Sequence, residues 1–128
     1  MDTVGFIALW NRVDQWHPAA AEAIKPLLAE GVGFYTTSFI LLECGNASAR
    51  APYRHEPDVA RERFEAAKTL IYPTADDWTE AWRMYRRGNA ASAGIVDQVS
   101  FIVMRRMGIR QAFTNDRHFT AAGFETLF

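Results

Sequence analysis

Four carboxylates that are far apart in the sequence each follow or interrupt an apolar segment: Asp2, Glu43, Asp97 and Asp116. An acid beside an apolar run costs free energy unless it meets a cation or hydrogen-bond donors. In a parallel α/β sheet such positions converge at the carboxyl edge, where ligands bind. Four acids gathered there repel one another, and a hard divalent cation is the simplest way to neutralise them. The sequence therefore predicts a metal site built from these acids.

The elements that must position these acids alternate between helices and short strands. We expect helices over residues 3–12, from Pro18 to about Gly31, from an N-cap at Ser38 through Cys44, over 58–69, from a cap at Thr74 or Asp76 through Tyr85, and over 95–107, with a helical turn at 116–122. We expect strands over 32–37, 70–72, 111–114 and 124–128, and a small-residue loop over 88–94. This alternation predicts an α/β class fold with three layers, α/β/α, around a parallel sheet.

The composition suits one folded domain, residues 1–128. The chain has 128 residues, of which 49% are hydrophobic, enough for a full core. A single cysteine, Cys44, excludes an internal disulfide and favours a reducing cytoplasm. No run approaches the roughly 20 apolar residues of a membrane span. Asp2 and Trp10-Asn11-Arg12 interrupt the apolar pattern of a signal peptide, so we expect none.

The net charge of −1 does not predict a protein that binds nucleic acid over its whole surface. The positive charges are nevertheless grouped: Arg50, Arg54, His55, Arg61 and Arg63; Arg83, Arg86 and Arg87; and Arg105, Arg106 and Arg110. Two interpretations stay open for each group. The arginines either cover solvated helix faces or contact phosphates around an acidic centre.

The segments around the four acids resemble a known family, the PIN-domain nucleases, in particular the VapC-like toxins of bacterial toxin–antitoxin pairs. The resemblance rests on Asp2-Thr3, Leu42-Glu43, Val96-Asp97-Gln98-Val99-Ser100-Phe101, Thr114-Asn115-Asp116-Arg117-His118-Phe119 and Ala122-Gly123-Phe124. It covers essentially the whole chain, in order and with ordinary spacing. The segments 96–101 and 114–119 together are its most specific part.

This resemblance implies a Mg²⁺- or Mn²⁺-dependent endoribonuclease that hydrolyses phosphodiester bonds in RNA. Asp2 and Asp97 match the metal ligands, Glu43 and Asp116 match the other two acids of the cluster, and Thr114 matches a supporting hydroxyl. The expected partners are an RNA substrate, a cognate antitoxin protein and a second copy of the chain in a homodimer. The expected location is the cytoplasm, with no membrane association.

The chain departs from this family at its start. Family members carry an apolar strand before the first Asp, whereas only Met1 precedes Asp2 here. The resemblance therefore predicts a PIN-like fold whose first strand is missing or reduced to a stub. We also expect Asp2 to lie on a mobile terminus, because no strand fixes its position.

Two alternative functions remain at this stage. The first is a truncated, non-catalytic homologue that binds the antitoxin or RNA; this alternative depends on whether Asp2 lies near Asp97. The second is a magnesium phosphotransferase on a similar sheet. That chemistry calls for a second acid two residues after the first Asp, where this chain has Val4.

Other conspicuous residues have structural interpretations. Asp2, Asp97 and Asp116 are each plausible helix N-caps, and Glu43 a surface residue of its helix. We interpret the remaining residues as follows: His17 and His118 as packing residues, Cys44 as a small core residue, Asp76-Asp77 as a helix cap, and Trp78, Trp82 and Tyr85 as core or dimer packing in preference to base stacking.

Overall fold

The computed structural model of the protein describes residues 1–88 and 92–128, so part of the predicted loop over 88–94 lies outside the described residues. The described helices are α1 (Thr3–Trp10), α2 (His17–Ala29), α3 (Ser38–Ser48), α4 (Glu56–Ala66), α5 (Ala75–Arg87), α6 (Ile95–Met107) and α7 (Arg117–Ala121). The strands are β1 (Thr36–Thr37), β2 (Leu70–Ile71), β3 (Gln111–Ala112) and β4 (Glu125–Thr126). Every expected helix and strand is present, although the strands are shorter than predicted.

Two helix starts show how side chains set the element boundaries. Thr74 begins α5 with a capping box, because its Oγ1 accepts from the N–H of Asp77 and its own N–H donates to Asp77 Oδ2 at 2.8 Å. The predicted Asp76-Asp77 cap is thus confirmed at Asp77. The predicted N-cap at Ser38 is wrong by one residue: Thr37 is extended, and its Oγ1 accepts from the N–H of Ile40.

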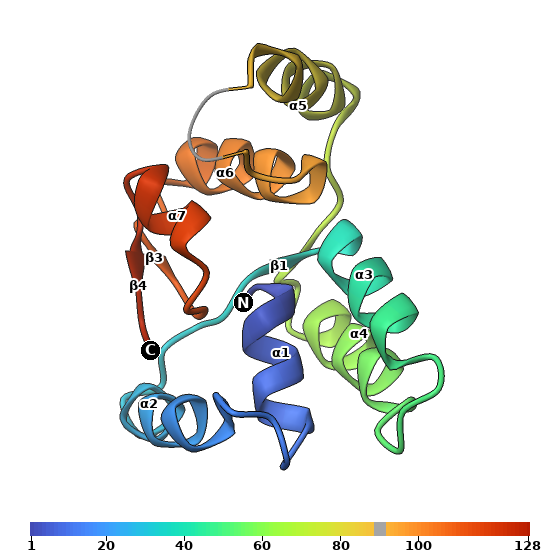
Figure 1. Cartoon of the computed structure of the whole chain (residues 1–128), viewed down its shortest axis with the longest axis vertical. Helices are drawn as coiled ribbons and strands as arrows, with labels where there is room; N and C mark the ends of the chain where they lie inside the picture. Colours follow the sequence, from blue (N-terminus) through green and yellow to red (C-terminus); the bar gives the residue numbers. More distant parts are fainter. Residues whose placement is uncertain (89–91) are drawn as a thin grey trace.

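The strands form two parallel pairs instead of one continuous sheet. β1 pairs with β2, and β3 pairs with β4. Figure 1 shows the N-terminus near the middle of the molecule, between β1 and the β3–β4 pair. The prediction of an α/β fold with parallel strand pairing is therefore confirmed.

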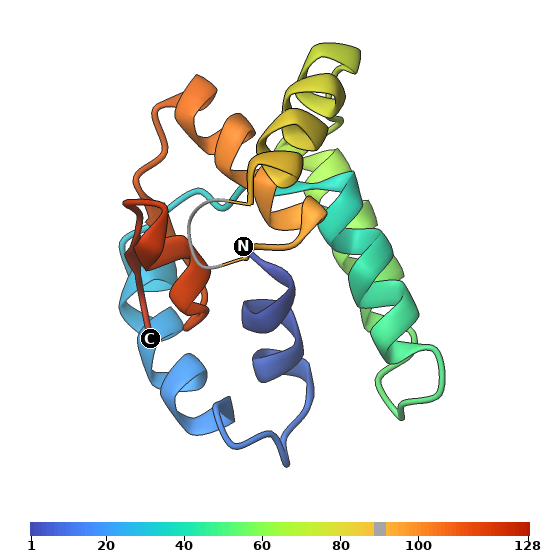
Figure 2. The same cartoon turned by 45° about the horizontal axis from the view of Figure 1, so that its top comes forward.

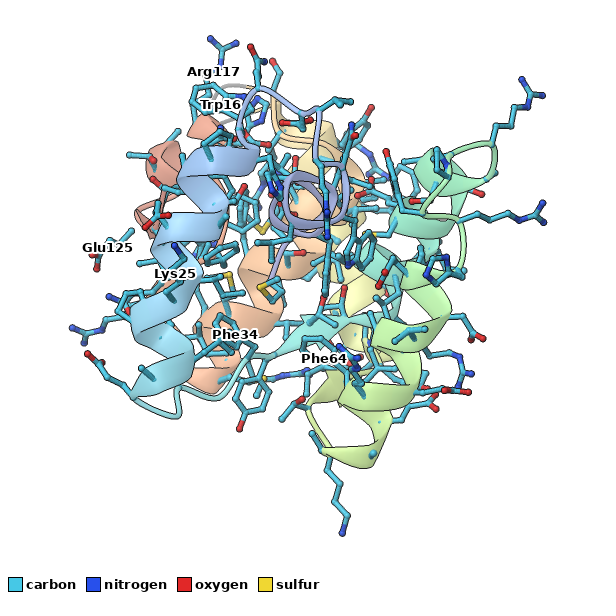
Figure 3. The ribbon with its side chains drawn as sticks, turned by 90° about the horizontal axis from the view of Figure 1, so that it is seen from below. Trp16, Lys25, Phe34, Phe64, Arg117 and Glu125 are labelled. Carbon is cyan, nitrogen blue, oxygen red and sulfur yellow. The ribbon has the colours of Figure 1, made fainter. Side chains whose placement is uncertain are left out.

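The helices cover these strands from several sides. α1 packs between α2 and α3, as Figure 3 shows with α1 seen end-on, and α5 packs along α6. The two views in Figures 1 and 2 agree that α5 and α6 lie together, away from α2. An ion pair of 2.8 Å between Arg106 of α6 and the buried Asp77 of α5 ties this pair of helices together.

The core consists of several apolar clusters around α1, α3 and α6. Phe6, Ile40 and Cys44 form one of them, and Cys44 is fully buried, as predicted for a small core residue. Phe101 and Phe119 form the centre of another, with ring centroids 5.0 Å apart. Among the described residues, no helix has the length and apolar character that crossing a membrane requires.

The aromatic residues of α5 do not enter the core. Trp78, Trp82 and Tyr85 are 48%, 38% and 49% exposed, so the predicted core packing is wrong for these three side chains. Their rings instead stack edge to face along the helix, with centroids 5.6 Å and 5.5 Å apart. Dimer packing stays a prediction for this aromatic row.

Candidate metal centre

Asp2 is buried and held in place, although it is the second residue of the chain. Its side chain is the N-cap of α1, accepting from the N–H of Val4, and the hydroxyl of Thr114 donates to its Oδ2 at 3.0 Å. Only 5% of Asp2 is exposed. Burial raises the pKa of its carboxyl above the ordinary value, against the lowering effect of the hydrogen bonds that it accepts.

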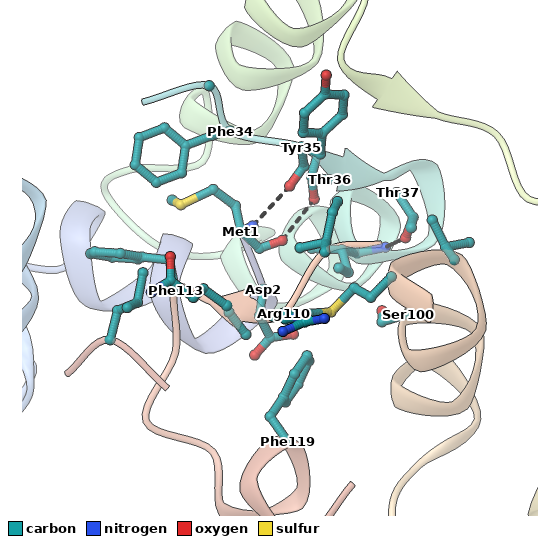
Figure 4. Close-up of a pocket in the computed structure, with 18 of the residues that line it drawn as sticks. Met1, Asp2, Phe34, Tyr35, Thr36, Thr37, Ser100, Arg110, Phe113 and Phe119 are labelled. Carbon is teal, nitrogen blue, oxygen red and sulfur yellow. Dashed lines mark hydrogen bonds between the residues drawn. The ribbon is translucent and has the colours of Figure 1, made fainter. Parts of the chain in front are cut away.

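The expectation that Asp2 lies on a mobile terminus is wrong for this structure. The amine of Met1 donates to the carbonyl of Tyr35 at 2.8 Å, and the hydroxyl of Thr36 donates to the carbonyl of Met1 at 3.0 Å. These two contacts join Met1 to β1 and to Tyr35, the residue before this strand. They fix the backbone just before Asp2 (Figure 4).

Thr114 connects two of the acids. Its side chain is fully buried, donates to Asp2 and accepts from the backbone N–H of Asp116 at 3.0 Å. A hydroxyl has one proton to donate, so the Asp116 N–H fixes its orientation toward Asp2. Thr114 therefore lies where the resemblance predicts a supporting hydroxyl.

Asp97 lies at the first turn of α6 and faces the other acids. Its Oδ2 accepts from the N–H of Gly94 at 2.8 Å. The pKa of Asp97 is raised to about 6, first by burial and then by the negative charges of Asp2, Asp116 and Glu43, against the lowering effect of the hydrogen bond from Gly94. The structure thus brings the four predicted acids within electrostatic reach of one another. The non-catalytic alternative requires Asp2 to lie far from Asp97. Because Asp2 lies near enough to raise the pKa of Asp97, this alternative gains no support.

Glu43 occupies the outer edge of the cluster. It is exposed on α3, and its Oε2 accepts from the hydroxyl of Thr3 at 2.7 Å. Thr3 directly follows Asp2, so this contact connects α3 to the start of α1. Glu43 is the member of the cluster with the freest access to water.

His118 is a candidate site residue that the sequence analysis interpreted as a packing residue. One ligand atom from each of Asp97, Asp116 and His118 lies within 4.8 Å of the other two. The Nδ1 atom of His118 is 2.8 Å from Asp116 Oδ1. The available signal was its position two residues after Asp116, in the first turn of a short helix, where the backbone N–H of His118 also binds Asp116.

The donor atoms present here fit a divalent cation. Carboxylate oxygens suit Mg²⁺ and Mn²⁺, and an imidazole nitrogen adds a ligand that the softer Mn²⁺ accepts more readily. Within residues 1–88 and 92–128, the buried Nδ1 of His118 makes no hydrogen bond of good geometry, although it lies 2.8 Å from Asp116 Oδ1. A cation bound among these side chains would neutralise the clustered acids and offer a partner to the imidazole nitrogen of His118.

The predicted N-cap role is confirmed for Asp2 and Asp116 and is wrong for Asp97, which is the third residue of α6 and lies behind the N-cap Gly94. Asp2, Asp97 and Asp116 each accept from a backbone N–H at the start of α1, α6 or α7. Helix N-termini carry partial positive charge, which offsets part of the repulsion between the acids. Helix capping and metal binding are therefore compatible roles at these positions.

Comparison with known proteins places this geometry in a family. No family model matches the chain. The chain is 32% identical, over 129 residues, to the 23S rRNA-specific endonuclease VapC20 of two Mycobacterium tuberculosis strains, CDC 1551 / Oshkosh and ATCC 25618 / H37Rv. The alignment covers 97% of this chain and 93% of that protein. The chain belongs to the VapC-like toxins of the PIN-domain family.

The structure agrees with this membership. The crystal structure of M. tuberculosis VapC20, described as a sarcin–ricin loop cleaving toxin, superposes on it with a TM-score of 0.77. The sequences are 31% identical, and the match covers 96% of this chain and 93% of that one. The predicted PIN-like fold of a VapC-like toxin is therefore confirmed, and the phosphotransferase alternative gains no support.

Proposed function

We propose that this VapC-like chain is a metal-dependent endoribonuclease toxin that hydrolyses phosphodiester bonds in RNA. The observation that carries the proposal is the convergence of Asp2, Glu43, Asp97 and Asp116 on one site, where burial first and the neighbouring charges second raise the pKa of Asp97 to about 6. A pKa that is shifted by burial and by nearby like charges is typical of residues in functional sites. The family membership supports the same activity.

We assign the acids different roles according to their surroundings. Asp97 and Asp116, with His118 beside them, would hold Mg²⁺ or Mn²⁺ directly. Asp2, fixed by Thr114, completes the negative field from its buried position. Glu43, exposed and oriented by Thr3, is placed to orient a water or accept its proton. When bound, the cation supplies an activated water and neutralises charge on the scissile phosphate.

We assign the RNA contacts to exposed arginines that carry no carboxylate partner in the described residues. Arg117 directly follows Asp116, and Arg86 and Arg87 end α5; all three are exposed. By contrast, Arg61 and Arg106 bind carboxylates, and Arg105 stacks over Phe124, so part of the positive charge has a structural role. Because VapC20 is named for 23S rRNA, ribosomal RNA is the substrate class to test first.

The partners follow from the same family membership. We propose that a cognate antitoxin protein inhibits this chain in the cytoplasm, where its RNA substrate is present. We further propose a homodimer, supported by the exposed aromatic row Trp78, Trp82 and Tyr85 on α5. Aromatic side chains are enriched at protein–protein interfaces relative to the rest of the surface.

Metal binding is expected to depend on Asp97 and to weaken in acid. Calorimetric titration with Mn²⁺ at pH 7.5 should give weak, saturable binding that Asp97→Asn abolishes. The pKa of Asp97 is about 6, so its carboxylate is charged above that pH and protonated below it. The apparent affinity should therefore fall as pH decreases through about 6. Asp76→Asn, at an exposed acid of α5, is the control and should bind as wild type. Equal Mn²⁺ binding by wild type and Asp97→Asn would remove Asp97 from the site.

His118 is expected to set the preference between the two cations. His118→Gln removes the imidazole near Asp97 and Asp116 while keeping a polar side chain. We expect Mn²⁺ affinity to fall by about tenfold or more and Mg²⁺ affinity to change much less, since imidazole suits Mn²⁺ better than Mg²⁺. Mn²⁺ electron paramagnetic resonance and competition by Mg²⁺ measure both affinities. His55→Gln, at an exposed histidine, is the matched control; a parallel fall for both cations would contradict a selective role.

A further inference from the structure

The exposed side of α3 runs from Glu43 to the end of the helix and beyond it. Four exposed residues, spaced three or four apart, share this side: Glu43, Asn46, Ala47 and Arg50. Ala49 closes α3 with helical backbone angles, so Arg50 continues the same stripe. Helix of this length spans about 10 Å, which places the backbone of Arg50 about two turns beyond Glu43.

The connection that follows, between α3 and α4, is held by its own backbone. The N–H of Ala51 donates to the carbonyl of Ser48 at 2.9 Å, and the N–H of Arg54 donates to the carbonyl of Ala51 at 3.1 Å. Figures 1 and 2 both show this connection projecting at the edge of the molecule, at the end of α3 remote from α5. Arg54 is exposed there, as Arg50 is. We call residues 46–54 the basic arm.

The basic arm carries positive charge that the described residues do not neutralise. Residues 44–55 contain no Asp or Glu. The acids of the neighbouring helix α4 have other partners: Glu56 lies 3.3 Å from Nε2 of His55, and Arg61 binds Asp58, Glu62 and Glu65 at 2.7, 3.6 and 2.6 Å. In the described part of the chain, neither Arg50 nor Arg54 forms an ion pair. Two guanidinium groups are therefore available to an anionic ligand.

The surface between Glu43 and Arg50 suits a phosphate backbone. Ala47 has a short side chain, so a nucleic-acid strand can approach α3 closely, and the amide of Asn46 offers a hydrogen-bond donor. A guanidinium group can bind a phosphate through two N–H groups at once. A length of about 10 Å corresponds to roughly three stacked nucleotides at about 3.4 Å each. A strand with one phosphate at the clustered acids therefore reaches the basic arm along α3.

We propose that the basic arm binds the phosphate backbone of the RNA about three nucleotides from the bond that is cut, with Arg50 and Arg54 each contacting a phosphate. The arm adds affinity and fixes the direction in which the strand leaves the acids, and it does not touch the reacting atoms. Continuity with Glu43 favours RNA over an acidic protein as the occupant. This proposal rests on the proposed ribonuclease function, because it takes RNA as the substrate.

The salt dependence of RNA binding tests this proposal. The probe is a fluorescein-labelled single-stranded RNA of about 20 nucleotides, whose anisotropy is followed in EDTA at several KCl concentrations. Each lost phosphate contact lowers the slope of log affinity against log salt concentration by about 0.7. We expect this decrease in Arg50→Gln and in Arg54→Gln, and a decrease of about 1.4 in the double variant. The affinity should fall about three- to tenfold per substitution at about 0.1 M KCl.

Arg12→Gln is the matched control. Arg12 is also exposed and forms no ion pair within the described residues, but it follows the far end of α1, about 15 Å of helix from Asp2. Its slope should equal that of wild type. In cleavage assays with Mn²⁺, the two arm variants should raise KM by about the factor lost in affinity and keep kcat within about twofold of wild type.

Slopes equal to that of Arg12→Gln would overturn the proposal, and so would a fall in kcat at unchanged KM, which indicates a structural role. Polyglutamate is titrated in parallel. A loss of affinity for polyglutamate with unchanged RNA binding would overturn the proposal in favour of an acidic protein partner. Binding in EDTA requires no cleavage, so equal slopes with normal cleavage would remove the arm alone, whereas lowered slopes support the arm even if wild type cuts no RNA.

Discussion

Replacing Asp97 with Asn is expected to reduce RNA cleavage by about a hundredfold or more, as loss of one preorganised charged group typically does. The same change should stabilise the metal-free fold. The pKa of Asp97 is raised to about 6, so its charge destabilises the folded state at neutral pH, and asparagine removes that charge. The amide oxygen can still accept from the N–H of Gly94. We expect a gain of about 1–2 kcal/mol at pH 7.5, after allowing for solvent screening of a half-buried group.

The sign of this stability difference depends on pH. For a carboxyl whose folded-state pKa is raised, the penalty is present above about 6 and disappears as pH falls toward the ordinary value near 3.8. Thermal melts of wild type and Asp97→Asn in EDTA should therefore converge between pH 7.5 and pH 4.

Asp116→Asn should lose RNA cleavage as Asp97→Asn does, whereas Asp76→Asn should retain it. Cleavage that survives EDTA would contradict the metal-dependent mechanism for the whole site.

Replacing Gly5 with Ala is expected to destabilise the fold by about 3 kcal/mol. A Cβ atom at Gly5 would lie 2.2 Å from the carbonyl oxygen of Phe113, so α1 or the segment after β3 must move. That movement separates Asp2 from Thr114, which directly follows Phe113, so cleavage should fall with stability. Domains of this size are stable by about 5–15 kcal/mol, and the loss should lower the melting temperature clearly.

Gly45→Ala is the matched control for this change. Gly45 also lies inside a helix, α3, but no atom lies within 4 Å of a Cβ built there. Alanine is favoured over glycine within a helix by about 0.5–1 kcal/mol, so Gly45→Ala should raise the melting temperature slightly. If Gly5→Ala melts as high as Gly45→Ala and cuts RNA normally, the close approach of α1 to Phe113 is not required for the site.

Local sequence signals were sufficient for the helices. The boundaries of α6 were predicted as observed, because an apolar run fills the helix and Gly108 ends it in the left-handed conformation. The N-cap is Gly94, and Asp97 accepts from its backbone N–H. Thr74, one of the two caps predicted for α5, is the N-cap in the structure. The predicted strands were too long. An apolar run such as residues 32–37 does not show how many of its residues form hydrogen bonds with a neighbouring strand, and only Thr36–Thr37 are in β1.

The sequence by itself determined the residue types that could bind a cation, their order along the chain and the α/β class. Tertiary structure decided which of them meet. Asp2 is held by Met1, Tyr35 and Thr114, contacts that span 34 to 112 residues of sequence and have no local signature. His118 likewise lies near Asp97 only in the folded protein, because the distance between them depends on how α7 packs against α6. Desolvation and electrostatic repulsion act through space, so the raised pKa of Asp97 exists only once the fold has brought the acids together.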